Sequence, residues 1–597
     1  MIKEIWKVRD YVDIRWRYFL IGMVFMGLNA MLNGISIFSI VPLLDKVIAG
    51  KKVILPEKLP VYVGVRLDPI VNFLNTLPPS SLLKYLITFI LITIALKGSF
   101  SYLNQYYFTL FGLHLVTDIR NRMYKKTTAL SMDFFVYGKA GEITSRLLYD
   151  VHLFAGIFQS QIPQIIFQGT LAVVYLVIVF TIDWQMAFLA MLIFPPILYP
   201  IYRTGKRLKE LGRRIQVSYG KIGNLVHEGV YAQQIIKAYN QEEGMSKRFC
   251  DENSRILRTV IACTKRVLLI SPFTEIISVL GTSGLLYYGA NKVMEGSLSS
   301  GFLFLFFVAL FSLISPFKNI GTTYGKLKQN SSALPRIFSF LETKVSVVDT
   351  GKDVFSGLRE GIEFQGVCFS YGKKQVLQDI TFSLKKGERL GIVGPTGVGK
   401  TSLIGLILRF YEPEKGQILI DGKDIRRYKL STLREHIGFV PQEPILFNDT
   451  LTRNISLSES PDMERVKKAA EIVGISDFIE SLPNGYDTIA GDRGMSFSGG
   501  QKQLICVARA IYRNPEVIIL DEATASLDSQ SEKALQEAME RIMGGRTVFI
   551  IAHRLSTLRS VDRIIVLKEG RIVEEGSHNQ LVEKKGEYYH FWELQVH

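Results

Sequence analysis

Gly394-Pro-Thr-Gly-Val-Gly-Lys400-Thr401 is the stretch that decides the fold of the C-terminal half of this 597-residue chain. An apolar run at 390–393 precedes it and a helical run at 402–410 follows it, which is the context that a phosphate-binding loop requires. Its glycines let backbone N–H groups wrap around phosphates, and the following helix N-terminus adds favourable charge. We expect Lys400 to reach the β- and γ-phosphates and the Thr401 hydroxyl to bind Mg²⁺. The stretch therefore predicts a site for ATP and Mg²⁺.

A second motif is an apolar strand, 517–520, that ends in the carboxylates Asp521 and Glu522. Beside a phosphate loop, Asp521 can hold the Mg²⁺ shell, and Glu522 can orient or deprotonate the attacking water. The other strand candidates are 362–364, 389–393, 438–440, 548–551 and 563–566. Their alternation with helices predicts an α/β domain with a largely parallel sheet.

Phe497-Ser-Gly-Gly-Gln501 resembles the signature sequence of ATP-binding-cassette (ABC) proteins, with Phe in place of the commoner Leu. The other motifs of that family occur in order and at suitable spacing. They are the adenine-stacking aromatic at Tyr371, the glutamine of the Q-loop at Gln442, the exporter segment Asp492-Arg-Gly494, the D-loop Ser526-Leu-Asp528 and the switch histidine at His553. The resemblance implies an ATP hydrolase coupled to transport, with Glu522, His553 and Gln442 as catalytic residues.

The resemblance also implies a partner. In the family, the signature of one subunit caps the ATP that the phosphate loop of the other subunit holds, so a chain with one copy of each half must dimerise. Because Glu522 and the signature are intact, a homodimer is favoured over a pair with a sister subunit. The implied nucleotide contacts are Tyr371, Gly394, Pro395, Thr396, Gly397, Val398, Gly399, Lys400, Thr401, Ser402, Asp521, Ser498, Gly499, Gly500 and Gln501, and the implied Mg²⁺ ligands are Thr401 and Gln442.

The N-terminal half contains apolar windows of the length that spans a membrane, which takes about 20 helical residues. There are six, at about 18–44, 85–113, 153–182, 185–202, 267–290 and 298–317. They predict an all-α polytopic membrane domain at 1–328, joined by a linker at 329–356 to a nucleotide-binding domain at 357–597. This half also resembles the six-helix exporter type of the family.

Charge supports this division. Apolar residues make up 48% and charged residues 21% of the chain, a balance that suits a protein that is part membrane and part soluble. Lys and Arg gather before the first window and after the second and fourth, so both termini are expected to be cytoplasmic. Much of the net charge of +16 is thus explained by topology, and a nucleic-acid partner is not needed.

Two inner loops, 114–152 and 203–266, have helical patterns and are interpreted as cytoplasmic extensions of the membrane helices. Around 132–150 and 226–240 they would dock on the nucleotide domains. The first outer loop, 45–84, is proline-rich; its role is open, and a short surface helix around 69–77 is one interpretation. The four cysteines form no CxxC pair, so neither metal binding nor disulfides are indicated.

Charges inside membrane helices are costly and usually functional. The sequences around Lys97, Arg146 and Lys318 resemble those of the lipid A flippases of Gram-negative bacteria, with Lys in place of the Arg of that group at 97. The resemblance implies that the three basic residues line an inner cavity and meet lipid phosphates. Pairing with Glu275, or extension of Lys318 to the membrane surface, is the structural alternative.

The leading interpretation is an ATP-driven flippase that moves a lipid A-core-like lipid from the inner to the outer leaflet of the bacterial inner membrane. A multidrug or peptide exporter of the same architecture is the alternative within transport. A soluble ABC ATPase that acts on DNA or ribosomes is a further alternative, and the six apolar windows argue against it.

Overall fold

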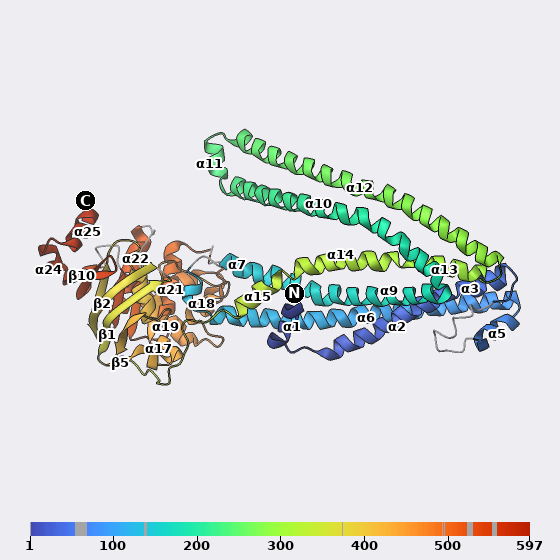
Figure 1. Ribbon diagram of the computed structural model, residues 1–597. Coiled ribbons are helices and arrows are strands. Elements are labelled where there is room, and N and C mark those ends of the chain that lie inside the picture. Colours follow the sequence, from blue (N-terminus) through green and yellow to red (C-terminus); the bar gives the residue numbers. More distant parts are fainter. Residues whose placement is uncertain are drawn as a thin grey trace. The chain divides into compact units, whose positions relative to one another are not determined.

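The computed structural model of the chain describes residues 2–53, 68–136, 140–372, 374–491, 494, 496–521, 529–551 and 558–596. These residues form two compact units (Figure 1). The first, here called the membrane unit, comprises Met1–Met123 and Arg146–Phe340. The second, here called the nucleotide unit, comprises Tyr124–Ser145 and Leu341–His597.

All the regular secondary structure among the described residues of the membrane unit is helical. Its elements are α1 (Ile2–Tyr11), α2 (Trp16–Phe38), α3 (Ile40–Pro42), η1 (Leu43–Ile48), α5 (Asp68–Thr76), α6 (Pro79–Ala129), η3 (Arg146–Asp150), α8 (Val151–Gly156), η4 (Ile157–Gln161), α9 (Ile162–Ile182), α10 (Trp184–Tyr231), α11 (Gln233–Ala238), α12 (Glu242–Met294), α13 (Ser300–Ser312), α14 (Ile314–Asn330) and α15 (Ala333–Leu341). Helix α9 packs against α2, α13 and α14, and α10 lies beside α12 (Figure 1).

The boundary between α9 and α10 shows how the chain turns at the end of a predicted window. Asp183 has an extended backbone (φ −155°), and its side chain accepts hydrogen bonds from the N–H groups of Gln185 and Met186, both at 2.9 Å. This N-cap satisfies donors that the first turn of α10 leaves free. The predicted windows 153–182 and 185–202 are therefore separated by a capped helix start.

Four stretches of the described residues are long and apolar enough to cross a membrane: Trp16–Ile48, Pro79–Ala129, Gly141–Ile182 and Ser300–Leu341. Three of them contain a predicted window, and Ser300–Leu341 covers all but the first two residues of the window 298–317. The other two, 185–202 and 267–290, lie inside the long helices α10 and α12, and their status as spans stays a prediction. Helices α6, α10 and α12 continue far beyond the windows, so 114–129, 203–231 and 242–266 are helical, and their cytoplasmic location stays a prediction.

The nucleotide unit contains both sheets of the described chain. Its elements are η2 (Met132–Phe134), α7 (Ala140–Ser145), β1 (Gly361–Tyr371), β2 (Lys374–Lys385), β3 (Arg389–Val393), α16 (Lys400–Ile407), β4 (Lys415–Ile420), β5 (Lys423–Asp424), η5 (Ile425–Arg427), α17 (Leu430–Glu435), β6 (Ile437–Val440), α18 (Leu451–Ser456), α19 (Met463–Val473), α20 (Ser476–Ser481), η6 (Gly485–Asp487), α21 (Gly499–Ile511), β7 (Val517–Asp521), α22 (Ser529–Met543), β8 (Thr547–Ile551), β9 (Arg563–Lys568), β10 (Arg571–Gly576), α24 (His578–Glu583) and α25 (Glu587–Val596).

The larger sheet has the strand order β10-β9-β3-β8-β7-β6, in which only β10 is antiparallel to its neighbour. The predicted largely parallel sheet is thus confirmed, with all the predicted strands except 362–364 in it. Strand 362–364 belongs instead to a second, antiparallel sheet with the order β2-β1-β4-β5, which the sequence did not predict.

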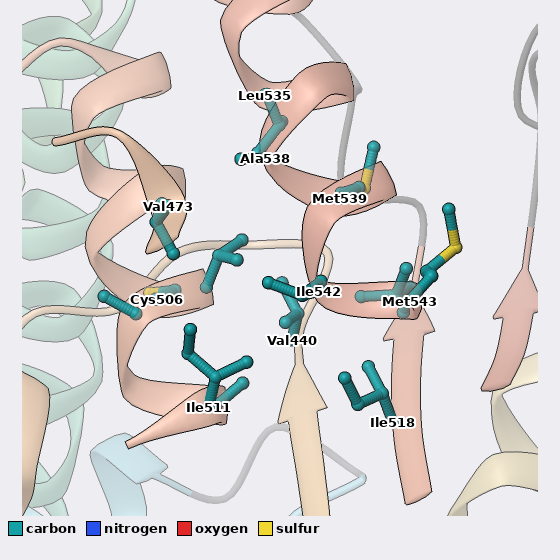
Figure 2. Close-up of a cluster of buried hydrophobic side chains, with 14 of the residues drawn as sticks. Val440, Val473, Cys506, Ile511, Ile518, Leu535, Ala538, Met539, Ile542 and Met543 are labelled. Carbon is teal, nitrogen blue, oxygen red and sulfur yellow. The ribbon is translucent and has the colours of Figure 1, made fainter. Parts of the chain in front are cut away.

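Two apolar cores surround the larger sheet. One fills the space between the antiparallel sheet, α16 and one face of the parallel strands. The other joins the opposite face to α19, α21 and α22, and Figure 2 shows Cys506 and Ile511 of α21 in the same cluster as Val440 of β6 and Ile518 of β7. The parallel strands are buried on both faces, so their carboxyl ends are held rigidly.

Candidate functional site

The candidate nucleotide site lies at one edge of the parallel sheet. Strands β3, β8, β7 and β6 are neighbours in that order and run the same way. The chain therefore leaves all four strands at the same edge, where ligands bind in open α/β sheets. The phosphate loop follows β3, Asp521 ends β7, and Gln442 comes two residues after β6.

The loop between β3 and α16 has a backbone that only glycine adopts easily. Gly397 and Gly399 have φ of +82° and +109°, in the left-handed region. A Cβ at Gly399 would lie 2.8 Å from Leu377 and 2.9 Å from Val376 of β2, whereas a Cβ at Gly397 would meet no atom within 4 Å. Gly399 thus lets the loop pack on β2, and the space beside Gly397 is open.

Lys400 is the first residue of α16 and is 5% exposed. Its ammonium donates to the carbonyl oxygens of Gly394 at 2.8 Å and Pro395 at 3.1 Å, so the charge is held at the loop. Thr401, next in the chain, is exposed, and Ser402 is buried. A helix N-terminus, an ammonium group and an open glycine-rich loop fit a polyphosphate chain.

Tyr371 and Tyr411 pack next to the loop helix. The Tyr371 hydroxyl lies 3.1 Å from the Ser402 hydroxyl, and its ring meets those of Phe369 and Tyr411 edge-on at centroid distances of 4.8 and 5.3 Å. Burial, with a hydrogen bond to Tyr371, raises the pKa of Tyr411 far above its usual value. The predicted adenine-stacking residue is therefore fixed beside α16, and its stacking role stays a prediction.

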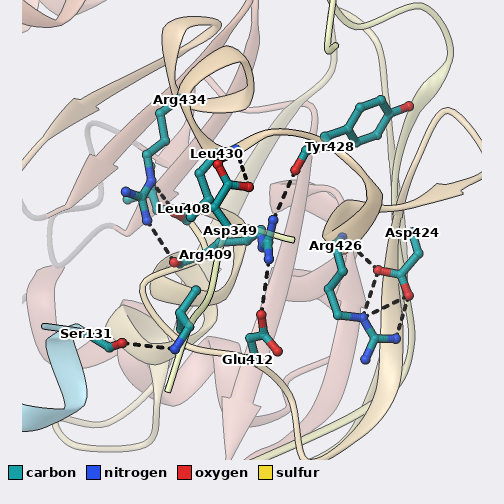
Figure 3. Close-up of polar contacts among 11 residues, drawn as sticks. Ser131, Asp349, Leu408, Arg409, Glu412, Asp424, Arg426, Tyr428, Leu430 and Arg434 are labelled. Atoms are coloured by element: carbon teal, nitrogen blue, oxygen red, sulfur yellow. Dashed lines mark hydrogen bonds and ion pairs between the residues drawn. The ribbon is translucent and has the colours of Figure 1, made fainter. Parts of the chain in front are cut away.

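A buried arginine holds the turn that carries Tyr411. Arg409 is 1% exposed, and it donates to the Tyr428 carbonyl at 3.2 Å and to Glu412 at 3.1 Å (Figure 3). Arg434 donates to the Arg409 carbonyl at 2.8 Å. This network fixes the chain directly after α16, and nothing in the sequence pattern singled it out.

The signature sequence forms the start of α21. Ser498 is its N-cap: the Ser498 hydroxyl accepts from the Gln501 N–H at 3.3 Å, and the Gln501 side chain accepts from the Ser498 N–H at 3.0 Å. This capping box orients the N-terminus of α21, where Gly499 and Gly500 begin the helix. The ring of Phe497 is 7% exposed and meets Phe478 edge-on at 6.1 Å. Phe therefore serves as a core anchor at the position where the family commonly has Leu.

Asp521 ends β7 and is 4% exposed, while Gln442 is exposed at the same sheet edge. Glu522, His553, residues 492–493 and the predicted D-loop lie outside the described residues. The strands that precede Glu522 and His553, β7 and β8, are paired side by side. Oxygen groups such as those of Thr401, Gln442 and Asp521 are the ligands that Mg²⁺ prefers, together with substrate phosphates.

The predicted substrate residues lie on three elements of the membrane unit. Lys97 is half-buried in the middle of α6, and Lys318 is exposed in α14. Arg146 is half-buried in η3, with its guanidinium 5.9 Å from the centre of the Phe340 ring. Within the part of the chain that the structure describes, Glu275 pairs with neither lysine.

The first outer loop contributes a contact that no sequence motif indicates. Asp45 is 2% exposed and accepts hydrogen bonds from the Ser299 hydroxyl at 2.6 Å, the Ser300 hydroxyl at 3.1 Å and the Gly301 N–H at 2.7 Å. It thus caps the N-terminus of α13 from a distant part of the chain. The helix expected around 69–77 is present as α5.

Comparisons with known proteins agree with this geometry. The family model described as "ABC transporter transmembrane region" matches residues 19–317, and the model described as "ABC transporter" matches residues 377–525. The chain is an ABC transporter.

Two relatives of this transporter are named "ATP-dependent lipid A-core flippase". The one from Syntrophus aciditrophicus is 37% identical over 518 residues, which cover 86% of each chain. The one from Desulfotalea psychrophila is 34% identical over 580 residues, which cover 96% of each chain. Among solved structures, a bacterial Atm1-family ABC exporter with ATP bound matches with a TM-score of 0.73 and 25% identity, covering 98% of this chain and 99% of that one. The transporter is thus an ATP-hydrolysing membrane protein with the exporter fold.

Proposed function

We propose that this transporter is a flippase that moves a phosphorylated amphipathic lipid of the lipid A-core kind from the inner to the outer leaflet of the bacterial inner membrane. The observation that carries the proposal is its likeness, over nearly its whole length, to two relatives that bear the name lipid A-core flippase. Both termini are proposed to lie in the cytoplasm, because Lys and Arg flank the helix ends on that side.

The basic residues of the membrane unit support this substrate class. Lys97 and Lys318 carry charge on α6 and α14 without an ion pair among the described residues. Arg146 is the third basic residue, and its side chain already contacts Phe340. Cations within an apolar unit suit a lipid whose head group carries phosphates, because burying an unpaired charge is otherwise costly.

The nucleotide unit supplies the energy. The phosphate loop and Lys400 would bind the phosphates, and Thr401, Gln442 and Asp521 would hold Mg²⁺. Glu522 would orient the attacking water, and His553 would contact the γ-phosphate. Mg²⁺ neutralises charge on the phosphates when bound. The Ser498 end of α21 closes over the nucleotide of a second copy of the chain, so the proposed assembly is a homodimer with two sandwiched nucleotides. Closure would turn the cavity outward, and hydrolysis would reset it.

The hydrogen bonds of the first inner loop support its proposed coupling role. Within the nucleotide unit, the Val347 N–H donates to the Ser131 hydroxyl at 3.0 Å, and the Ser346 hydroxyl is hydrogen-bonded to Asp133. The segment around η2 is thereby fastened to the chain that leads into β1. A loop fastened in this way can carry nucleotide-driven movement toward α6 and η3, between which it lies in the sequence.

A multidrug or peptide exporter is the second candidate, and the aromatic side chains of α13 favour it. Phe304 and Phe311 are 52% and 50% exposed, and such rings suit apolar cargo of many shapes. Phe302 and Phe306, in contrast, are buried in the core of the membrane unit, so they are not available to contact cargo.

The experiment that distinguishes the flippase from the multidrug or peptide exporter uses purified transporter in lipid nanodiscs. It measures how added lipid A or drug changes the rate of ATP hydrolysis. Phosphorylated lipid A is expected to raise the ATPase rate, and Lys97→Gln with Lys318→Gln is expected to abolish most of that stimulation while basal hydrolysis stays within about twofold. Lys84→Gln, at an exposed lysine of the same helix as Lys97, is the matched control and should leave stimulation intact. If cationic drugs raise the ATPase rate equally in wild type and in the Lys97 and Lys318 variant, the transporter is instead a multidrug exporter.

A further inference from the structure

Helix α21, which begins at the signature sequence, is hydrogen-bonded to the chain on both sides of Gln442. The Gln503 side chain, 2% exposed, donates to the carbonyl of Pro441 at 3.2 Å. Arg509 donates through Nη1 to the carbonyl of Ile445 at 2.9 Å. Gln442 therefore lies in a short segment, 441–445, here called the Gln442 bridge. Both ends of this segment are hydrogen-bonded to α21.

Arg509 also binds a buried asparagine that organises the chain after this bridge. Its Nε donates to the Asn454 carbonyl at 2.7 Å and its Nη2 to the Asn454 side chain at 3.2 Å. Asn454 is 0% exposed, accepts from the Phe447 N–H at 2.8 Å, and donates to the carbonyls of Phe447 at 2.9 Å and Thr450 at 3.1 Å. Arg509 thus holds the whole stretch from Ile445 to Thr450 through one side chain.

The partners of Arg509 are neutral among the described residues. They are two carbonyls, one amide oxygen, the sulfur of Cys506 at 3.8 Å and the face of the Phe447 ring at 5.8 Å. Burial lowers the pKa of Arg509, because the charge is taken out of water without a carboxylate beside it. Only the planar fork of arginine reaches several carbonyls at once, so lysine cannot replace these contacts.

Helix α21 is continuous from the signature to Gln503 and Arg509, so it keeps them at fixed distances. Ser498 caps one end of α21, and Arg509 lies near the other end, about 16 Å away along an α-helix. Cys506 and Ile511 pack the same helix into the core beside Val440, the residue directly before Pro441 (Figure 2). A shift of the Gln442 bridge must therefore move the signature with it.

We propose that Arg509, with Gln503, is a positioning residue for ATP hydrolysis: it fixes the distance between Gln442 and the signature so that both arrive together at their nucleotides. Gln442 serves the ATP of its own chain, and Ser498 serves the ATP of the second copy. Arg509 links the two sites of the dimer without contacting either nucleotide. The inference rests on the proposed homodimeric ATPase, and it is independent of which lipid is carried.

Arg509→Lys in the full-length protein tests the inference, and Arg546→Lys is the matched control. Arg546 makes the same kind of fork, to the carbonyls of Pro515 at 3.1 Å and Ile542 at 2.7 Å and to Asn514 at 2.8 Å, and burial lowers its pKa as well. Both variants should lower the melting temperature by similar amounts. Arg509→Lys alone should lower the kcat for ATP about tenfold, because two or more charge-assisted hydrogen bonds that set the closed geometry are lost.

Nucleotide affinity separates positioning from a general loss of structure. Measured without Mg²⁺, and hence without turnover, ATP binding to Arg509→Lys should stay within about twofold of wild type, because the phosphate loop is untouched. Equal effects of the two substitutions on kcat, or a normal kcat for Arg509→Lys, would overturn the inference.

Phe447→Leu provides a second variant that does not threaten folding, since Phe447 is 56% exposed. It removes only the ring beneath the guanidinium, and kcat should fall about twofold to threefold. An unchanged kcat in this variant counts against Arg509 as the positioning residue. Because these readouts are ATPase rates without added lipid, failure of the lipid proposal shows separately, as wild-type protein that lipid A does not stimulate.

Discussion

The two units of this transporter hold their important polar groups in opposite ways. In the nucleotide unit, the groups expected to hold the phosphates lie within a few residues of one another, in the loop 394–401, and their geometry depends on local backbone angles. In the membrane unit, the buried contacts join distant parts of the chain, as Asp45 does with Ser299 and Gly301. Chemistry that is encoded by spacing can be found from sequence, whereas chemistry that is encoded by helix packing needs a structure.

The largest effect is expected on ATP affinity, from a substitution that changes the backbone of the phosphate loop. Gly399→Ala places a Cβ at φ +109° and 2.8 Å from Leu377, so the loop must distort. We expect affinity for ATP to fall roughly tenfold to a hundredfold, because backbone strain of this kind costs about 1–3 kcal/mol. Isothermal titration with ATP measures the change.

Gly422→Ala is the control for that experiment. Gly422 also has a positive φ, +73°, but a Cβ there meets no atom within 4 Å, and the residue lies in the turn between β4 and β5. The same strain should lower stability and leave ATP affinity unchanged. A loss of affinity in Gly422→Ala as large as in Gly399→Ala would show that local loop geometry is not what matters.

The next effect tests the membrane unit. Asp45→Ala removes the acceptor for two hydroxyls and one N–H at the start of α13. Because buried donors are left without a partner, we expect the free energy of unfolding of the membrane unit to fall by about 2–3 kcal/mol. Hydrogen exchange of α13 in detergent reports the loss.

Glu295→Ala serves as the comparison for Asp45→Ala. Glu295 directly follows α12, and its side chain is exposed. Its removal also takes away one negative charge but no buried acceptor, so stability should change by less than about 0.5 kcal/mol. Similar losses in the two variants would mean that net charge, rather than the cap on α13, stabilises this unit.

The smallest effect is a pH dependence at the C-terminus. Burial lowers the pKa of His578, whose Nδ1 lies 2.7 Å from the Tyr588 hydroxyl, and burial also raises the pKa of Tyr588 to about 12. Because the folded-state pKa of His578 lies below its unfolded value near 6.5, the stability it contributes is complete above about pH 6.5 and is lost as the pH falls through the folded-state pKa.

Hydrogen exchange of α24 and α25 at pH 8 and pH 5.5 tests this dependence. After each rate is divided by the intrinsic exchange rate at its pH, lower protection factors are expected at pH 5.5 than at pH 8, and His578→Gln should remove most of the difference. Protection factors that are the same at both pH values in the wild-type protein would contradict the assignment.

The sequence predicted the parallel strands well because they are continuous apolar runs. Strand β3 was predicted with its observed bounds, Arg389–Val393. Strand β2, Lys374–Lys385, was missed because its buried residues alternate with Lys, Gln, Asp and Ser, so hydropathy gives no run. Hydropathy windows likewise found the long helices but not the break after Phe38 or at Leu313, because a helix end depends on local hydrogen bonds.

The residues of the candidate site also fall into two groups, those that sequence motifs predict and those that only the fold reveals. Lys400, Ser498 and Asp521 lie where their motifs placed them, at a helix start, at a helix cap and at a strand end. Arg509 and Asn454 could not have been predicted, since they are 55 positions apart and have no fixed spacing. Their importance comes from burial and from the carbonyls they meet, which only the folded chain defines.

The most direct test of the central claim, that nucleotide closure drives lipid movement, is a flipping assay with the full-length transporter in sealed vesicles. A fluorescent phosphorylated lipid A analogue is placed in the vesicle membranes, and its exposure to an external quencher is followed. Wild-type protein is predicted to change that exposure only with ATP and Mg²⁺, and Glu522→Gln is predicted to bind ATP yet flip about a thousandfold more slowly, as expected for loss of a catalytic base. Vesicles in which wild-type protein hydrolyses ATP at full rate while the lipid stays where it was would contradict the account.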